Sequence, residues 1–199
     1  MKKISFIALL FAGLSAQAQL DGKLGVKGGL NLSSIKGLGA SSSSKAGLHL
    51  GLLSHLHIAP EWSLQPEVMY SNQGATYKSG GEEHNLALHY INIPIQLQYM
   101  FNNGFRLQTG PQLGLLVDVT DKVDGEDQTT HLTSDYFKVP DVSWTFGTSY
   151  LTYSGFGLDA RYNLGLSKIN DKGTGTLKNS VWQFGVFYLF DHKHKAHSR

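Results

Sequence analysis

Alternation of apolar and polar residues with a period of two runs through nearly the whole sequence, and it limits the possible folds more than any other feature. In the segment Tyr90–Phe101, Ile91 and Ile93 are apolar while Asn92 and Gln96 are polar. Successive side chains of a β-strand point to opposite faces, whereas an amphipathic helix repeats about every 3.6 residues. No stretch beyond the N-terminal segment keeps a helical period. The sequence therefore predicts an all-β fold.

Eight segments carry this alternation, and the connections between them are alternately long and short. The expected strands are residues 23–33, 47–58, 62–71, 90–101, 105–119, 141–151, 156–167 and 182–190. The short connections are 59–61, 102–104 and 153–155, and the long ones are 34–46, 72–85, 120–140 and 168–179. Outer-membrane barrels have short periplasmic turns and longer external loops, and an even strand number closes the meander without an edge. The sequence therefore predicts an eight-stranded antiparallel up-and-down transmembrane β-barrel.

The two faces of the expected strands differ in composition. One face is apolar with almost no charge and has aromatic residues near the strand ends, while the other is rich in Gly, Gln, Asn and Ser. Strands of about ten residues match the length that crosses a bilayer at a tilt. A secreted soluble eight-stranded ligand-binding barrel would turn the apolar face inward and remains an alternative. We expect the apolar face to contact lipid.

The N-terminus predicts a secretory signal peptide over residues 1–18. Lys2 and Lys3 precede an apolar run, and small residues surround the expected cleavage site before Gln19. The apolar run is too short to cross a bilayer as a helix. We expect an outer-membrane barrel domain over residues 19–190 and a basic, histidine-rich periplasmic tail over residues 191–199.

Composition excludes several classes of function. The chain has no cysteine, which rules out a lipid-modified cysteine, a disulfide framework and a cysteine nucleophile. The full chain has 17 Lys and Arg against 15 Asp and Glu, and the loss of Lys2 and Lys3 with the signal peptide leaves a balance of zero. Nucleic-acid binding depends on clustered basic residues, so we expect no nucleic-acid partner.

A set of charged residues falls on the expected inner face. Its members are Lys27, Glu67, Arg106, Asp118, Asp159 and Arg161. Buried charges must be paired, and a narrow barrel fills its interior with side chains. The pattern predicts a structural polar network without catalytic residues, and no open pore. An outer-membrane lipid- or peptide-cleaving barrel enzyme is the alternative, and it would need Ser, His and Asp clustered at the external rim.

Histidines are the other candidates for chemistry. His49, His55 and His57 share one face of an expected strand, but no carboxylate stands at a recognisable ligand spacing. Hydrogen bonding inside the barrel is the favoured interpretation. We expect no metal and no cofactor.

The chain resembles the PorT-type outer-membrane β-barrel proteins of Gram-negative bacteria. The resemblance lies in residues 25–33, 64–74, 90–99, 109–116 and 160–171 and in the closing aromatic strand. Pro66, Pro94 and Pro111, which are unusual inside strands, also resemble the family pattern. The resemblance implies an eight-stranded outer-membrane barrel, supplies no catalytic residues, and points to protein secretion through the founding member. The tail after Phe190 departs from members that stop at the aromatic residue.

The last strand resembles the C-terminal assembly signal of outer-membrane barrels. The residues that carry this resemblance are Gln183, Gly185, Tyr188 and Phe190. They imply recognition by the barrel assembly machinery during biogenesis. Other expected partners are outer-membrane lipid and proteins that bind the external loops, chiefly residues Asp121 to Val139.

Overall fold

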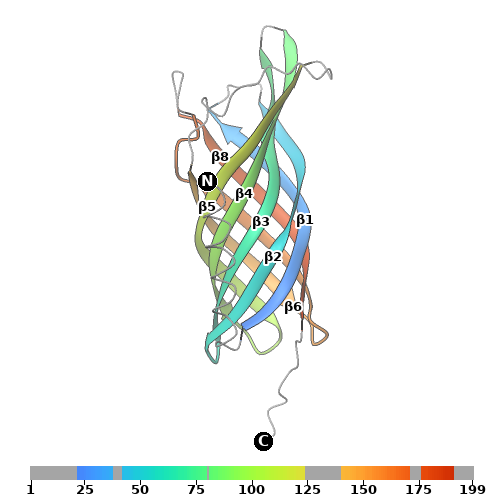
Figure 1. Ribbon diagram of the computed structural model, residues 1–199, viewed down its shortest axis with the longest axis vertical. Helices are drawn as coiled ribbons and strands as arrows, with labels where there is room; N and C mark the ends of the chain where they lie inside the picture. Colours follow the sequence, from blue (N-terminus) through green and yellow to red (C-terminus); the bar gives the residue numbers. More distant parts are fainter. Residues whose placement is uncertain (1–21, 38–41, 80, 124–139, 171–175, 191–199) are drawn as a thin grey trace, which may run out of the picture.

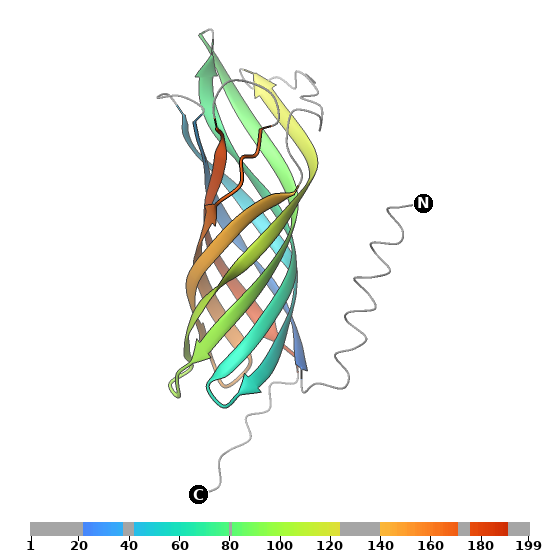
Figure 2. The same ribbon diagram turned by 90° about the vertical axis from the view of Figure 1, so that its left-hand side faces the viewer.

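The computed structural model describes residues 22–37, 42–79, 81–123, 140–170 and 176–190, and these form a closed barrel (Figures 1 and 2). The strands are β1 Gly22–Lys36, β2 Ser43–Ala59, β3 Trp62–Ser79, β4 Glu82–Met100, β5 Phe105–Val123, β6 Asp141–Leu151, β7 Phe156–Gly165 and β8 Lys178–Leu189. Each strand pairs antiparallel with its sequence neighbours, and β1 pairs with β8. The predicted fold class is confirmed.

The N-terminal signal segment and the C-terminal tail lie outside the described residues, so both stay predictions. Within the described part of the chain, no helix has the length and apolar character needed to cross a membrane.

The barrel has an apolar exterior and a polar interior. Large apolar side chains exposed on the outside include Leu30, Leu50, Leu107, Leu158 and Val186. The buried side chains are mostly Ser, Asn, Gln, His and charged residues. A soluble ligand-binding barrel requires the reverse arrangement, because its outer face must meet water. The soluble alternative is therefore wrong.

Aromatic side chains gather around the end of the barrel that carries the short turns. Trp62 packs edge-on against Tyr99 with ring centroids 5.1 Å apart, and Phe156 lies 4.8 Å from Tyr188. Towards the other end, Tyr162 lies 4.8 Å from Trp182. Aromatic girdles at both interfaces are typical of outer-membrane barrels, in which the short turns are periplasmic. We call the turn end the periplasmic end and the opposite end the outer end.

The prediction of a long connection at residues 72–85 is wrong, because most of these residues belong to β3 and β4. β3 and β4 stay paired from Asn72↔His89 to Ser79↔Glu82 and rise beyond the rest of the barrel (Figures 1 and 2). We call residues 72–89 the outer hairpin. Its outward face loses the apolar residues because strands that have left the bilayer no longer need an apolar outer face, whereas Ala75, Leu86 and Leu88 pack inside. The glycine and charged residues of this segment are typical of a loop, which is why the sequence predicted one.

The prolines lie inside strands without shifting their register. The β3–β4 pairing passes from Pro66↔Ile95 to Met69↔Asn92 with the same offset, and the pairs between them are missing. The β4–β5 pairing is interrupted in the same way between Pro94↔Gln112 and Leu97↔Thr109. The strands therefore open locally beside proline, where no backbone N–H is available.

Apolar clusters close both ends of the interior. At the periplasmic end, Leu53, Leu151, Phe187 and Leu189 pack together. The outer cluster consists of Ile35, Ala75, Leu86, Leu88, Tyr90 and Ile169, with Tyr77, Leu116, Val119 and Leu177 packed against it. The polar interior therefore lies between two apolar plugs.

A glycine makes room for the periplasmic plug. Gly157 is the cross-strand partner of Phe187, and a Cβ atom at Gly157 would overlap the Phe187 ring. We expect Gly157→Ala to lower the free energy of unfolding by about 1–3 kcal/mol, because the ring must move within a filled interior. Urea unfolding in lipid vesicles measures this. Gly28→Ala is the control, since its Cβ would meet only a flexible leucine methyl group at 3.3 Å and a carbonyl oxygen at 3.5 Å. Equal stability of the two variants would contradict the prediction.

Candidate functional site

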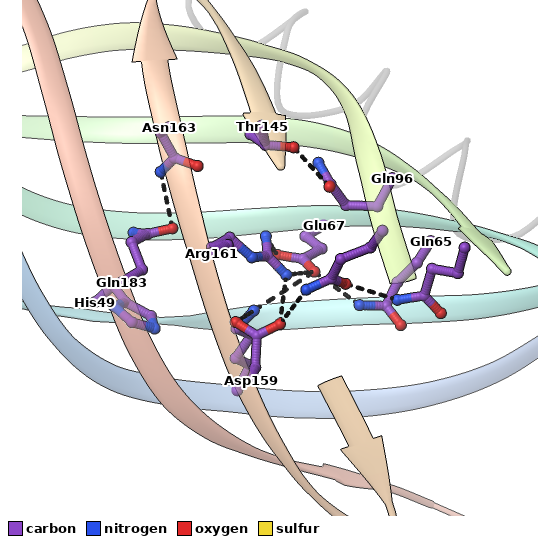
Figure 3. A network of polar contacts seen from close by, with 12 residues as sticks. His49, Gln65, Glu67, Gln96, Thr145, Asp159, Arg161, Asn163 and Gln183 are labelled. Carbon is purple, nitrogen blue, oxygen red and sulfur yellow. Dashed lines mark hydrogen bonds and ion pairs between the residues drawn. The ribbon is translucent and has the colours of Figure 1, made fainter. Parts of the chain in front are cut away.

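Four charged side chains meet in the centre of the barrel (Figure 3). Arg161 of β7 donates from Nη1 and Nη2 to Oε2 and Oε1 of Glu67 on β3, at 3.0 and 2.9 Å. Nη2 also donates to Oδ2 of Asp159 at 3.1 Å. Lys27 of β1 lies 2.5 Å from Oδ1 of Asp159 and 3.9 Å from Oε1 of Glu67. The two bases and two acids cancel in charge, and we call these residues the central network.

Amide side chains complete the hydrogen bonding of the central network. Gln108 of β5 donates to Asp159 at 2.5 Å, and Gln65 donates to Glu67 at 2.8 Å. Gln98 of β4 in turn donates to Gln108 at 2.9 Å. A buried ion pair is tolerated only when further hydrogen bonds satisfy its remaining polar atoms. The network thus ties together strands that lie on opposite walls of the barrel.

A second polar layer surrounds His49. Nδ1 of His49 is 2.8 Å from Oδ1 of Asn31, and Gln183 donates to the same oxygen at 2.9 Å. Asn163 donates to Gln183 at 2.9 Å (Figure 3). His49 is therefore hydrogen-bonded inside the barrel, as the sequence predicted.

The other two histidines lie near the periplasmic end. His55 is buried, and its ring meets that of exposed His57 edge-on at 4.6 Å. Within the described ranges, no group of three His, Cys, Asp or Glu residues has the geometry to hold a metal ion.

Arg106 was expected in the polar network but lies apart from its centre. It is buried on the inner face of β5, opposite Met100 and Ser149 on the neighbouring strands. No ion pair links it to another described residue, and its Nη1 has no hydrogen-bond partner among them. The structure therefore brings together Lys27, Glu67, Asp159 and Arg161, and leaves Arg106 outside the group.

The expectation that Asp118 faces the interior is wrong, because Asp118 is exposed. The β4–β5 register shifts between His89↔Asp118 and Tyr90↔Leu116, so that Val117 is an extra residue on β5. On the periplasmic side of this bulge the even-numbered residues of β5 face inward, and beyond it the odd-numbered ones do. A shift of one residue moves every following side chain to the other face.

The same bulge creates a contact that sequence reasoning missed. It turns Asp121 inward, where Oδ2 lies 3.1 Å from Nδ1 of His84. The apolar run Leu115–Val117, which breaks the alternation, was the available signal for the bulge. His84 also stacks on Tyr77 with ring centroids 4.9 Å apart.

The outer hairpin carries further contacts on its sides. Tyr70 and His89, at its base, stack at 6.0 Å, and the Tyr70 hydroxyl is 2.6 Å from Nδ1 of His89. Lys45 of β2 donates to Asn85 at 2.5 Å. Partial burial and the nearby charge of Lys122 lower the pKa of Lys45, which lies above the apolar band. The contacts hold the outer hairpin against its neighbours.

A small cavity lies in the outer half of the interior. It has about 10 Å³ of room for the centre of a water molecule, and its lining includes Asn92, Gln112, Asp141, Asn163 and Asn179. That is about the space of one water molecule. The cavity is therefore too small for an organic ligand.

The residues of the expected assembly signal occupy both faces of β8. Gln183 is buried and hydrogen-bonded, while Gly185 lies beside the His49 ring. Tyr188 and Phe190 lie at the periplasmic end with ring centroids 5.5 Å apart. This places the aromatic pair in the periplasmic girdle. Their role in assembly stays a prediction.

We expect the double variant Tyr188→Ala, Phe190→Ala to lower the amount of folded barrel in the outer membrane. The physical reason is loss of the aromatic pair by which the assembly machinery would bind the last strand. Heat-dependent electrophoretic mobility of membrane fractions measures the folded amount. Tyr150→Ala, Tyr153→Ala removes exposed aromatic residues from the same end outside β8 and serves as the control. Equal levels of folded barrel in the two variants would contradict the prediction.

Residues 16–171 match a family model described as outer membrane protein beta-barrel domain. No curated protein matches the sequence.

Two solved outer-membrane proteins are similar in fold. Neisserial surface protein A is 16% identical with a TM-score of 0.55, over 84% of this chain and 97% of that one. Ail, the attachment invasion locus protein of Yersinia pestis, is 15% identical with a TM-score of 0.52, over 86% of this chain and 100% of that one. At this identity the similarity concerns the fold.

Proposed function

Because the chain belongs to the outer membrane protein beta-barrel domain family, we propose that it is a sealed outer-membrane anchor that presents its outer hairpin and external loops to protein partners. The central network is the observation that carries the first half of this proposal. Its charges are paired with one another across the interior, and apolar clusters lie at both ends. A conducting pore needs a continuous water-filled path, which such an interior does not offer.

The outer hairpin supports the second half of the proposal. β3 has 18 residues and β4 has 19, against 11 in β6 and 10 in β7, so the pair extends well past the bilayer. Its strands are fully paired and are held by the stacks of Tyr77 on His84 and Tyr70 on His89. Binding residues are commonly carried by segments that a rigid scaffold holds in place. The main binding loop was predicted at Asp121 to Val139; residues 121–123 of it belong to β5, and residues 124–139 lie outside the described residues.

The proposed role is non-enzymatic. A general acid or base must reach its substrate, whereas the acids and bases of the central network are buried and engaged with one another. The resemblance to PorT-type proteins supports a finer assignment, in which the partners take part in protein secretion or surface assembly. Loss of specific proteins from the cell surface in a deletion strain is the expected result for that assignment, and an unchanged surface proteome contradicts it.

Two measurements test the proposal. In planar bilayers, the refolded protein should give no stable conductance steps. In cells, crosslinking followed by mass spectrometry should recover partners that are lost when residues 72–89 are replaced by an Asn-Gly turn joining Ser71 to Tyr90, which are cross-strand partners. Tyr153→Ala, at a periplasmic turn, is the control. Stable channels, or the same partners without the outer hairpin, would overturn the proposal.

A further inference from the structure

Three lysines lie side by side at the outer rim, where β7, β8 and β1 meet. Lys36 ends β1 and Lys178 begins β8, and the two are cross-strand partners. Lys168 follows β7, and the N–H of Ile169 donates to the carbonyl oxygen of Leu177 at 2.9 Å. That hydrogen bond joins the chain neighbours of Lys168 and Lys178. We call Lys36, Lys168 and Lys178 the lysine triad.

The backbone under the lysine triad is held in place by the outer apolar cluster. Each lysine is directly next in sequence to a residue of that cluster, namely Ile35, Ile169 or Leu177. Ile35 and Lys36 both lie in β1, where side chains alternate between faces, so Lys36 points outward. Lys36 is accordingly exposed, and Lys168 and Lys178 are half-buried. The backbone positions of the three lysines are therefore held by the fold.

The triad concentrates positive charge without a counterion among the described residues. Neither an ion pair nor a hydrogen bond links any of the three ammonium groups to another described side chain. The neighbouring segment 171–175 has one acidic and one basic residue, and 38–41 has no charge. Like charges directly opposite each other in a sheet are destabilising. An arrangement of this kind is stabilised when an anion binds between the charges.

The depth of the triad matches the headgroups of the outer leaflet. On β8, Trp182 belongs to the outer aromatic girdle, and Lys178 lies four residues closer to the outer end of the strand. Four residues of tilted strand rise roughly 10 Å along the bilayer normal. Aromatic girdles mark the interface between acyl chains and headgroups. The lysines therefore lie at the level of the lipid phosphates.

A buried hydroxyl group lies close to the lysine triad. Ser180 is the cross-strand partner of Ser34, one step below the pair Lys36 and Lys178. Its Oγ is buried and has no hydrogen-bond partner among the described residues. Buried hydroxyl groups are usually hydrogen-bonded, so Ser180 is an unsatisfied polar group close to the triad.

We propose that the lysine triad binds the phosphate of an anionic lipid headgroup in the outer leaflet. Juxtamembrane basic residues attract anionic lipid through charge complementarity. The contact would fix the rotation and depth of the barrel at the seam where the first and last strands close. This inference depends on the membrane position of the barrel and not on the proposed function of the outer hairpin.

Trp182 is a built-in reporter for the test. The chain has three tryptophans, and Trp62→Phe, Trp144→Phe leaves Trp182 alone, four residues from Lys178. The mature protein is refolded in phosphatidylcholine vesicles that contain either brominated phosphatidic acid or brominated phosphatidylcholine. We expect stronger quenching by phosphatidic acid. In the variant Lys36→Gln, Lys168→Gln, Lys178→Gln, the preference should fall roughly fivefold for each lysine removed.

Matched variants and a competitor separate the outcomes. Replacement of the three lysines by arginine should keep the preference, and Lys78→Gln, which removes an exposed lysine from the outer hairpin, should leave it unchanged. Heat-dependent mobility confirms that each variant is folded. An unchanged preference in the Gln variant would overturn the proposal. Loss of the wild-type preference in millimolar inorganic phosphate at constant ionic strength would assign the site to free phosphate and would also overturn it.

Discussion

Arg161→Ala should lower the free energy of unfolding of the barrel by about 3–5 kcal/mol. Arg161 makes two hydrogen bonds to Glu67 and one to Asp159 in the centre of the interior. Removal of the guanidinium leaves two buried carboxylates with only Lys27 as counterion. Urea unfolding in lipid vesicles, followed by tryptophan fluorescence, measures the change.

A double variant separates the effect of charge from the effect of lost packing. Arg161→Gln together with Glu67→Gln removes one charge of each sign and leaves the pair Lys27 and Asp159 balanced. Its free energy of unfolding should fall less than that of Arg161→Gln alone, because no uncompensated carboxylate remains. Equal destabilisation by the single and double variants would show that the balance of charge does not determine the stability of the interior.

Leu52→Arg should lower the free energy of unfolding by about 2–4 kcal/mol, the range for a charge near the bilayer midplane. Leu52 points outward from the middle of β2 and is 54% exposed outside the membrane environment. In a membrane its surface contacts acyl chains, so the guanidinium loses its hydration there. Unfolding in vesicles measures the change, as for Arg161.

Val117→Arg is the matched control for depth. Val117 is 57% exposed, nearly the same as Leu52, but it lies in the part of β5 that extends beyond the outer aromatic girdle. Its replacement by arginine should change the free energy of unfolding by about 0–1 kcal/mol. Equal effects at the two positions would contradict the placement of the bilayer, because solvent-exposed fractions alone predict no difference.

The two predictions concern the two requirements of a small membrane barrel. The exterior must be apolar, so the burial of apolar side chains in a core cannot stabilise this fold in the usual way. The interior must hold polar residues, which are stable only when they are paired. Arg161 and Leu52 each represent one requirement.

The sequence alone determined the number and order of the strands and the character of their faces. Those properties follow from the period of two and from the lengths of connections, which are local. The alternation also placed Lys27, Glu67, Asp159 and Arg161 on the inner face, because each lies in a stretch of regular strand. In the same way it identified the apolar face that contacts lipid.

Only the tertiary structure decided which inner residues meet and where the strands end. Glu67 and Arg161 are 94 residues apart in sequence, and their contact depends on closure of the barrel. The outer hairpin was missed because its apolar residues point inward and its outward face lacks the apolar residues of the membrane-spanning strands. Asp118 was misplaced because a single bulge at Val117 reverses the faces of β5. Local alternation shows which residues of a strand share a face, whereas register and closure are set by partners that are distant in sequence.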